Sequence, residues 1–348
     1  MQQLFKIFIQ VLFINLVFGD KLVDLHLIFR HGERVPERTY PTDPLKDIWT
    51  DPPGELTKMG QMHAFTQGLK IKQRYIEDLN YLNKNYWSRD IMVRSTFLNR
   101  TLASALIFMT AFYLDSEGTT PDDPRWPKGW NPIPVQTVPF EDEYLLLSFD
   151  ICKRFKRLAR EREFHPKVQQ LMLEEKPFLE ELAKNASLSV DDYSTYDGFW
   201  GFKDAVLIQT LMGLKRASWI TKEIWDRFLS TRQKVYYFVK GEAGFGEPEN
   251  VEMTAIGSGL FLKTLIDDME RKMAGQSSLK LHFYSAHDST ISYVLRALGP
   301  KTDVVGYGAP GFASTVAFEL WQDDHANHYV KLLYWKNNQT DVESIQQT

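Results

Sequence analysis

The residues best suited to chemistry in this chain are a histidine and the arginines beside it. His31 lies between Arg30 and Arg34 in the string Arg-His-Gly-Glu-Arg-Val-Pro. Arginine keeps its charge, and its planar guanidinium matches the geometry of a phosphate group. Nearby positive charge lowers the pKa of a histidine, so an imidazole nitrogen stays free in mildly acidic solution. Such a neutral imidazole can attack phosphorus and form a phosphohistidine.

Three residues further along the chain extend this candidate site. Arg94 is predicted to bind the same phosphate as the two earlier arginines. His287 can hydrogen-bond the phosphoryl oxygens from the opposite side, and a protonated Asp288 can act as general acid for a leaving alcohol. The alternative is that each arginine forms a structural ion pair with a local carboxylate such as Glu33, Glu37 or Asp90.

Short apolar runs precede each of these polar groups. They cover residues 22–29, 90–93 and 279–284, and each is typical of a strand buried on both faces of a mostly parallel sheet. Ligands of open α/β sheets bind outside the carboxyl ends of the strands, which is where these runs end. We expect a fourth strand over 315–321. Helices are predicted over residues 56–80, 98–112, 255–273 and 289–298.

The chain is predicted to form two domains after residue 19. Residues 20–145 and 250–348 would form an α/β core, with a mostly parallel mixed sheet flanked by helices. Residues 146–249 look mostly helical and would form a smaller cap inserted into this core. Residues 115–139 contain six prolines and two glycines, which predicts an irregular surface segment.

Residues 1–19 have the features of a secretory signal peptide. Lys6 precedes an apolar stretch that is shorter than the ~20 residues needed to span a bilayer. We expect cleavage before Asp20 and a product that is secreted or delivered to the lysosomal lumen. Three sequons would then be candidate glycosylation sites, at Asn99, Asn185 and Asn338.

Composition argues against several other classes of protein. The chain has 348 residues, of which 43% are hydrophobic and 25% charged, as in ordinary globular proteins. Its formal charge of −4 and its lack of a long basic run argue against nucleic-acid binding. Cys152 is the only cysteine, which excludes an intramolecular disulfide and a cysteine-rich zinc site. We expect no membrane span in the mature chain.

Five segments together resemble one protein family. They are residues 27–36 (LIFRHGERVP), 54–57 (GELT), 93–101 (VRSTFLNRT), 130–139 (WNPIPVQTVP) and 284–291 (YSAHDSTI). The first and last resemble the N-terminal and C-terminal signatures of the histidine acid phosphatases, the secreted and lysosomal branch of the histidine phosphatase superfamily. The resemblance extends from about residue 21 to residue 335.

This resemblance implies a two-domain α/β fold with a helical cap, and hydrolysis of phosphate monoesters without a metal or other cofactor. It assigns His31 as nucleophile and Asp288 as proton donor, and it suggests a homodimer. The phosphate group would be bound by Arg30, Arg34, Arg94 and His287. Cys152 resembles a family half-cystine whose partner is absent here, and Asn99 stands where relatives often have an acidic residue.

Other functions stay open at this point. One is a phytase-like or lipid-phosphate phosphatase activity on the same fold. The other is a protein that binds a small molecule or a partner without turnover, since a fold does not guarantee activity.

The remaining histidines have structural interpretations. His26 and His282 lie within predicted strands, with nothing in the sequence to place a partner beside them. His325 and His328 lie near two aspartates in a polar loop, and spacing of this kind is weak evidence for a metal site.

Overall fold

The computed structural model describes residues 19–189, 198–337 and 343–345. The signal peptide expected over 1–19 therefore falls almost wholly outside the described residues. The chain divides into two units, the first comprising Met1–Glu33, Lys58–Leu147 and Ser258–Thr348, and the second Arg34–Thr57 and Ser148–Gly257. Residues 34–57 thus group with the helical insertion, whereas the boundaries expected from the sequence place them in the core.

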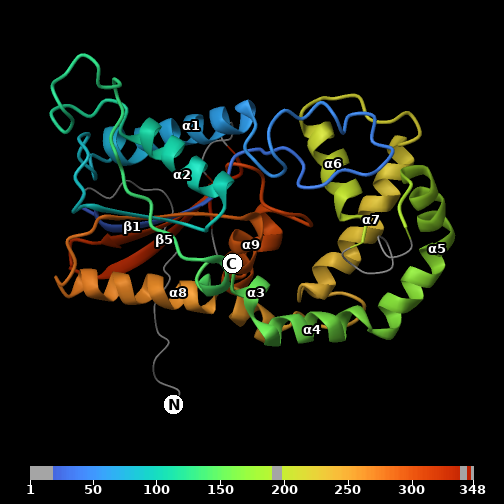
Figure 1. Cartoon of the computed structure of the whole chain (residues 1–348). Coiled ribbons are helices and arrows are strands. Elements are labelled where there is room, and N and C mark those ends of the chain that lie inside the picture. The colour runs from blue at the N-terminus through green and yellow to red at the C-terminus, as the bar shows by residue number, and fades with distance from the viewer. Residues whose placement is uncertain (1–18, 190–197, 338–342, 346–348) are drawn as a thin grey trace. The chain divides into compact units, whose positions relative to one another are not determined.

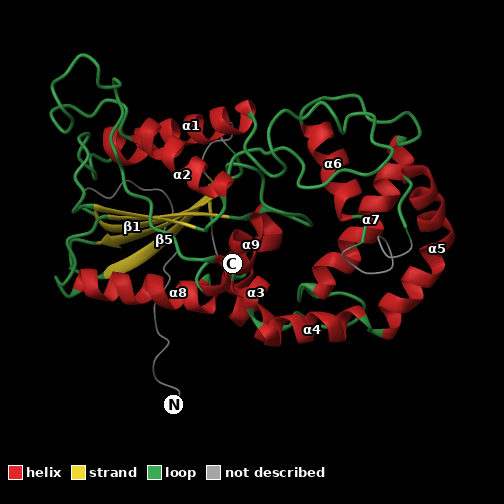
Figure 2. Cartoon of the chain, in the orientation of Figure 1, coloured by secondary structure: helices red, strands yellow, loops and turns green. Residues whose placement is uncertain are grey.

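The first unit is built on a six-stranded mixed sheet (Figure 2). Its strands are β1 Lys21–Arg30, β2 Ile91–Ser95, β3 Leu281–Ala286, β4 Thr315–Gln322, β5 His328–Trp335 and β6 Glu343–Ser344. Their order across the sheet is β2-β3-β1-β4-β5-β6. β3 pairs in parallel with both β2 and β1, whereas the pairs β1–β4, β4–β5 and β5–β6 are antiparallel.

The predicted fold class is confirmed, and the four expected strands are present as β1 to β4. Direct parallel pairing is confined to β2, β3 and β1, although β5 also runs in the direction of β1 because both are antiparallel to β4. The sequence does not predict β5 and β6. The first half of β5 is only partly buried and includes Lys331, so it lacks the uninterrupted apolar run that marks β1.

Helices cover both faces of this sheet (Figure 1). α1 Lys58–Lys72 and α2 Asn99–Phe112 pack on one face, where Leu27 and Phe29 of β1 join Phe108 of α2 in the core. α8 Val251–Met273 and α9 Asp288–Leu298 pack on the other face, where Ile28 of β1 joins Phe261 of α8. Alternate side chains of β1 therefore enter two different cores, which is why its sequence is almost continuously apolar.

Helices make up most of the described part of residues 148–257 in the second unit, as expected for residues 150–240. Its helices are α3 Ser148–Ile151, α4 Lys153–Glu163, α5 Pro166–Ala186, α6 Trp200–Leu211 and α7 Lys222–Val239. Phe202 and Phe228 lie at the centre of its core. Residues 34–57 belong here because Tyr40 is fully buried, with its ring 5.2 Å from that of Phe202.

The remaining elements are short. They are the π-helical segment η1 Gln73–Asp78, the 3₁₀ turn η2 Phe140–Asp142 and the helix α10 Lys301–Val304. Residues 115–139 are all described and, apart from a single bridge at Gln136, contain neither helix nor strand, as predicted. Within the described ranges, no helix is both long enough and apolar enough to cross a membrane.

Two glycines allow the segment after β1 to lie against the first turn of α1. A Cβ on Gly32 would lie 2.1 Å from the carbonyl oxygen of Gly60, and a Cβ on Gly60 would lie 1.8 Å from that of Glu33. Backbone atoms fill the space that a side chain would need, so only glycine fits at either position. The amide of Gly32 also donates to Oγ of Ser104 in α2 at 3.1 Å. These contacts hold His31 in place.

We expect Gly60→Ala to lower the free energy of unfolding by about 1–3 kcal/mol, because the new methyl group forces backbone apart in a packed region. The matched control is Gly259→Ala in α8, where nothing lies within 4 Å of the added Cβ. That change should raise stability by roughly 0.5–1 kcal/mol through helix propensity. Urea denaturation measures both variants, and equal effects would show that the Gly32–Gly60 approach is not tight in solution.

Candidate functional site

The carboxyl ends of β1 and β3 are neighbours because the two strands pair in parallel. Arg30 is opposite Ala286 in the register, and the amide of His31 donates to the carbonyl of Ala286 at 3.2 Å. His31 and His287, which follow the two strands, lie with ring centroids 5.4 Å apart. The structure therefore brings the two histidine motifs to one place, as the strand-end argument predicts.

His31 presents one defined ring nitrogen. Its Nδ1 lies 2.8 Å from the carbonyl oxygen of Gly32. A carbonyl oxygen can only accept a hydrogen bond, so Nδ1 carries the proton and Nε2 keeps its lone pair. Nε2 faces Arg100, whose Nε–H donates to it at 3.3 Å. The available nucleophilic atom is therefore Nε2, and it points at a guanidinium group.

The surroundings of His31 keep its ring neutral. The residue is 3% exposed, and this burial lowers its pKa well below 6.5. The positive charges of Arg100, His287 and Arg30 lower the pKa of His31 further, and only the hydrogen bond to the Gly32 carbonyl opposes them. The imidazole consequently stays unprotonated in mildly acidic solution, as the sequence motif predicts.

Arg100 lies against the candidate nucleophile His31, although the sequence motifs did not lead us to predict it there. It lies in the first turn of α2, which begins at Asn99 only four residues after β2 ends at Ser95. The start of a helix that directly follows a strand faces the carboxyl edge of the sheet and carries partial positive charge. That position, rather than the residue type alone, could have identified Arg100 from the sequence.

Arg94, a predicted phosphate ligand, is paired with a buried carboxylate. Its Nη2 donates to both carboxylate oxygens of Glu143, at 3.0 and 2.9 Å, and its Nη1 donates to the Ser95 carbonyl at 3.0 Å. Glu143 is 0% exposed, and a buried carboxylate without a charged partner is strongly unfavourable. Arg94 therefore forms a structural ion pair, which is the alternative considered for the arginines, although its partner is a distant carboxylate rather than Asp90.

Arg30 and Asp288 form an ion pair at the same sheet edge. Nη2 of Arg30 lies 3.0 Å from Oδ2 of Asp288, and Nη1 donates to the carbonyl of Pro310 at 2.6 Å. Asp288 is the first residue of α9, and its Oδ1 accepts the amide of Ser289 at 2.7 Å. Its side chain is 35% exposed, so a substrate can reach this carboxyl group.

His287 is held by two hydroxyl groups. Its Nε2 lies 3.0 Å from Oγ1 of Thr96, which in turn lies 2.8 Å from Oγ1 of Thr101 in α2. Oγ1 of Thr101 also donates to the backbone carbonyls of Thr96 and Leu98, which anchors this chain of hydroxyls. The ring itself is buried beside His31.

Arg34 belongs to the second unit. Its Nη1 and Nη2 donate to the two carboxylate oxygens of Asp204 in α6, both at 2.9 Å, and Glu37 lies 3.7 Å away. A bidentate pair of this kind fixes the plane of the guanidinium. The sequence suggests the nearby Glu37 as a partner, but the closer partner comes from 170 positions along the chain.

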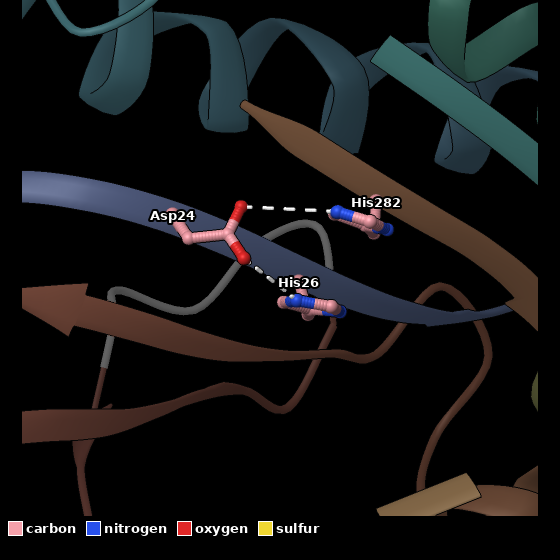
Figure 3. Close-up of side chains that lie close together, drawn as sticks. All are labelled: Asp24, His26 and His282. Atoms are coloured by element: carbon pink, nitrogen blue, oxygen red, sulfur yellow. Dashed lines mark hydrogen bonds and ion pairs between the residues drawn. The ribbon is translucent and has the colours of Figure 1, made fainter. Parts of the chain in front are cut away.

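One group in the described structure comes close to the arrangement of a metal site. Asp24, His26 and His282 offer ligand atoms within 4.8 Å of one another, and all three are buried. Figure 3 shows both rings turned toward the Asp24 carboxylate, with Nε2 of His26 3.1 Å from Oδ2. The rings are stacked, 4.2 Å apart and only 9° from parallel. Because a nitrogen lone pair lies in its ring plane, one ion cannot lie in both planes, and the group does not fit a metal as arranged.

These two histidines lie in the core, as expected from the sequence, and carboxylates lie beside both. Asp24 lies beside His26, and Oδ2 of Asp268 in α8 lies 3.3 Å from Nδ1 of His282. Burial, followed by the stacked His26, lowers the pKa of His282 to about 4. Carboxylates lie beside both buried rings, although Nδ1 of neither ring makes a hydrogen bond.

The expected modification sites are only partly described. Asn99 and Asn185 are exposed, at the start of α2 and near the end of α5, and Asn338 lies outside the described residues. Cys152 is a free thiol that is partly buried at the start of α4.

The chain matches the family model of the histidine phosphatase superfamily (branch 2) over residues 21–335. It is 31% identical to the prostatic acid phosphatase of Bos taurus over 320 residues, which cover 91% of this chain and 77% of that protein. It is 30% identical to the lysosomal acid phosphatase of Bos taurus over 313 residues, which cover 89% of this chain and 70% of the relative.

Solved structures show the same fold at lower identity. The multiple inositol polyphosphate phosphatase of Bifidobacterium longum superposes with a TM-score of 0.61 at 13% identity, covering 93% of this chain and 88% of that one. The phytase of Citrobacter braakii gives 0.60 at 15% identity, covering 90% and 85%. The resemblance of the motifs is thus confirmed, and the chain belongs to branch 2 of the histidine phosphatase superfamily.

Proposed function

We propose that this protein is an acid phosphatase that hydrolyses phosphate monoesters through a phosphohistidine on Nε2 of His31. The observation that carries the proposal is the state of that ring. Its Nδ1 proton is held by Gly32, its Nε2 lone pair is turned toward Arg100, and its pKa is depressed by burial. The relatives named prostatic and lysosomal acid phosphatase support the same reaction class.

The reaction proceeds in two steps. First, the Nε2 lone pair of His31 forms a bond to phosphorus while the ester P–O bond breaks, and Asp288 gives its proton to the departing alkoxide. Second, water attacks the phosphohistidine, passes a proton to the Asp288 carboxylate and releases inorganic phosphate as the N–P bond breaks. Asp288 ends each turnover protonated, so the cycle closes without a cofactor.

Positive groups stabilise the charge on the phosphoryl oxygens in both steps. Arg100 donates to the attacking nitrogen of His31, and the charge of Arg30 also acts on this ring, so we propose that both guanidinium groups bind the phosphoryl oxygens. His287 is a further proposed phosphate ligand in the same unit, and Arg34 stays a proposed ligand on the family resemblance alone. Arg100 takes the place that the sequence assigns to Arg94.

The cellular setting is also a proposal. A signal peptide over 1–19 would direct the chain to the secretory pathway, as an exported or lysosomal glycoprotein with sugars on exposed sequons such as Asn185. A homodimer stays proposed on the family resemblance. The alternative is a phytase-like or lipid-phosphate specificity. The phytase structures support only the fold of this chain, because a sequence identity of 14–15% does not indicate a shared substrate.

We expect His31→Ala to form no phosphoenzyme and to lose turnover, while it stays folded. Acid quenching of the wild type during turnover should trap a phosphoprotein that is labile to acid and stable to base. Because burial and nearby positive charge lower the pKa of His31, kcat/KM should persist well below the ordinary histidine pKa and fall only when acid protonates the ring. A phosphoprotein in the alanine variant, or an acid limb at the ordinary histidine pKa, would contradict the assignment.

Arg100 and Arg94 should respond oppositely to removal. Arg100→Ala should weaken vanadate binding by roughly 10- to 100-fold, as expected for loss of a charged contact of about 1.5–3 kcal/mol, with little change in stability. Arg94→Ala should instead destabilise the protein by about 3–5 kcal/mol, because Glu143 is left buried and unpaired.

The control for this comparison is Arg94→Met combined with Glu143→Leu, which removes both buried charges at once. This double variant should fold and bind vanadate within about threefold of the wild type, since the affected pair lies away from His31. Titration calorimetry measures the affinities. If the double variant folds but binds vanadate weakly, Arg94 is a phosphate ligand as the sequence motifs predict.

Asp288→Asn tests the proton donor through the leaving group. An alkoxide needs a proton to leave, whereas a nitrophenolate hardly does. Phosphoenzyme formation should therefore slow far more on an alkyl phosphate than on nitrophenyl phosphate, by about 10²-fold in the ratio. Rapid-quench measurement of that step avoids a shared dephosphorylation step. Losses of equal size on both substrates would make Asp288 a positioning residue only.

A further inference from the structure

The segment that precedes β4 contacts both residues that begin the reaction. The guanidinium carbon of Arg30 lies 3.9 Å from the centroid of the Phe312 ring. The His31 ring lies on the same aromatic side chain, with its centroid 5.7 Å from that of Phe312 and the two planes tilted by 51°. Phe312 has no role in the two chemical steps, yet it is packed against the phosphate ligand and the nucleophile together.

The backbone around Phe312 is tied to the same two residues. The amide of Arg30 donates to the carbonyl of Ser314 at 2.9 Å, and the amide of Ala313 donates to the carbonyl of His31 at 3.2 Å. Ala313 is fully buried and has a φ of +58°, a left-handed conformation that costs a non-glycine residue free energy. Such strain persists only where surrounding contacts impose it. Backbone hydrogen bonds with Arg30 and His31 at the end of β1 therefore fix the position of Phe312.

A contact other than the ion pair with Asp288 must keep the Arg30 guanidinium in place during the reaction. Its ion pair with Asp288, at 3.0 Å, is strong only while that carboxyl group is charged. The proposed mechanism requires Asp288 to carry a proton while substrate binds and until the ester bond breaks, so the ion pair is absent during phosphate binding. The Pro310 carbonyl at 2.6 Å and the face of the Phe312 ring are two contacts that do not depend on the charge of Asp288, and both still hold the guanidinium.

We propose that Phe312 is a positioning residue, whose ring face holds the Arg30 guanidinium in the orientation that binds phosphate while its side chain covers His31. This inference rests on the proposed phosphohistidine mechanism and adds to it a residue that acts through Arg30. The attraction comes from the ring quadrupole, so it belongs to aromatic side chains and is absent from an aliphatic one of similar bulk.

The test compares Phe312→Leu, which keeps apolar cover, with Phe312→Tyr, which keeps the ring. Titration calorimetry with inorganic phosphate at the acidic optimum should show about three- to tenfold weaker binding for the leucine variant, the range of a cation–π contact. The tyrosine variant should bind within twofold of the wild type. If the leucine variant does not fold, Phe312→Met provides the same loss of the ring in a side chain that adapts its shape.

A matched control comes from a second arginine–aromatic contact in the same unit. The Arg89 guanidinium lies 5.6 Å from the centroid of the Trp87 ring, which is 46% exposed. Trp87→Leu removes an aromatic partner of an arginine that has no part in the site. Its phosphate affinity and its rate of phosphoenzyme formation should match those of the wild type.

A double-mutant cycle tests whether Phe312 acts through Arg30. In the background of Arg30→Ala, the further change Phe312→Leu should alter phosphate affinity by less than twofold, because the group that the ring holds is absent. A full three- to tenfold loss in that background would overturn the proposal and make Phe312 a direct ligand contact.

The covering role has a separate readout. Phe312→Ala opens the space beside His31 to water, so the acid limb of kcat/KM should move to higher pH, whereas Phe312→Leu should leave the limb in place. Wild-type affinity in the leucine variant, or equal losses for leucine and tyrosine, would overturn the positioning role. Absence of a phosphoenzyme in the wild type would overturn the proposed function instead, so the two failures are distinguishable.

Discussion

The parallel pairing of β1 with β3 is the interaction on which the site depends. It places two strand ends from opposite parts of the chain in register, Arg30 opposite Ala286, so that His31 and His287 must emerge together. The strands are held in this register from both sides, because their alternate side chains enter one core under α1 and α2 and another under α8 and α9. A shift by one residue would exchange the two cores, and this resists any movement of the site.

The neutral state of His31 follows from the same packing. Its ring is buried between His287 and Phe312, and the backbone carbonyl of Gly32 fixes which nitrogen carries the proton. That carbonyl is in place because Gly32 and Gly60 let the chain lie directly on α1. Tautomer, orientation and a lowered pKa thus come from backbone contacts rather than from a dedicated carboxylate partner.

The arginines show how burial decides the role of a charged group. Arg94 neutralises a fully buried carboxylate of Glu143, and Arg34 is paired with Asp204, whereas Arg100 has a histidine nitrogen as its neighbour. A guanidinium that balances a fully buried anion, as Arg94 does for Glu143, is tied to that anion and gains little from binding phosphate. Arg30 is intermediate, because its partner Asp288 is partly exposed and must lose its charge during the proposed reaction.

The sequence by itself determined the reaction class and the α/β class, and it predicted which residues follow the strand ends. Apolar runs that end in Arg30-His31 and His287-Asp288 identify strand ends, because side chains buried on both faces leave no other pattern. The hydrophobic pattern of the sequence did not predict β5, because the first half of that strand is partly exposed. The sequence also could not distinguish the roles of Arg94 and Arg100, which lie six residues apart in one motif. That choice depends on Glu143, some fifty positions away, and the tie of residues 34–57 to α6 depends on Tyr40 meeting Phe202. Contacts between distant segments are decided by packing, and only the tertiary structure shows which carboxylate meets which arginine.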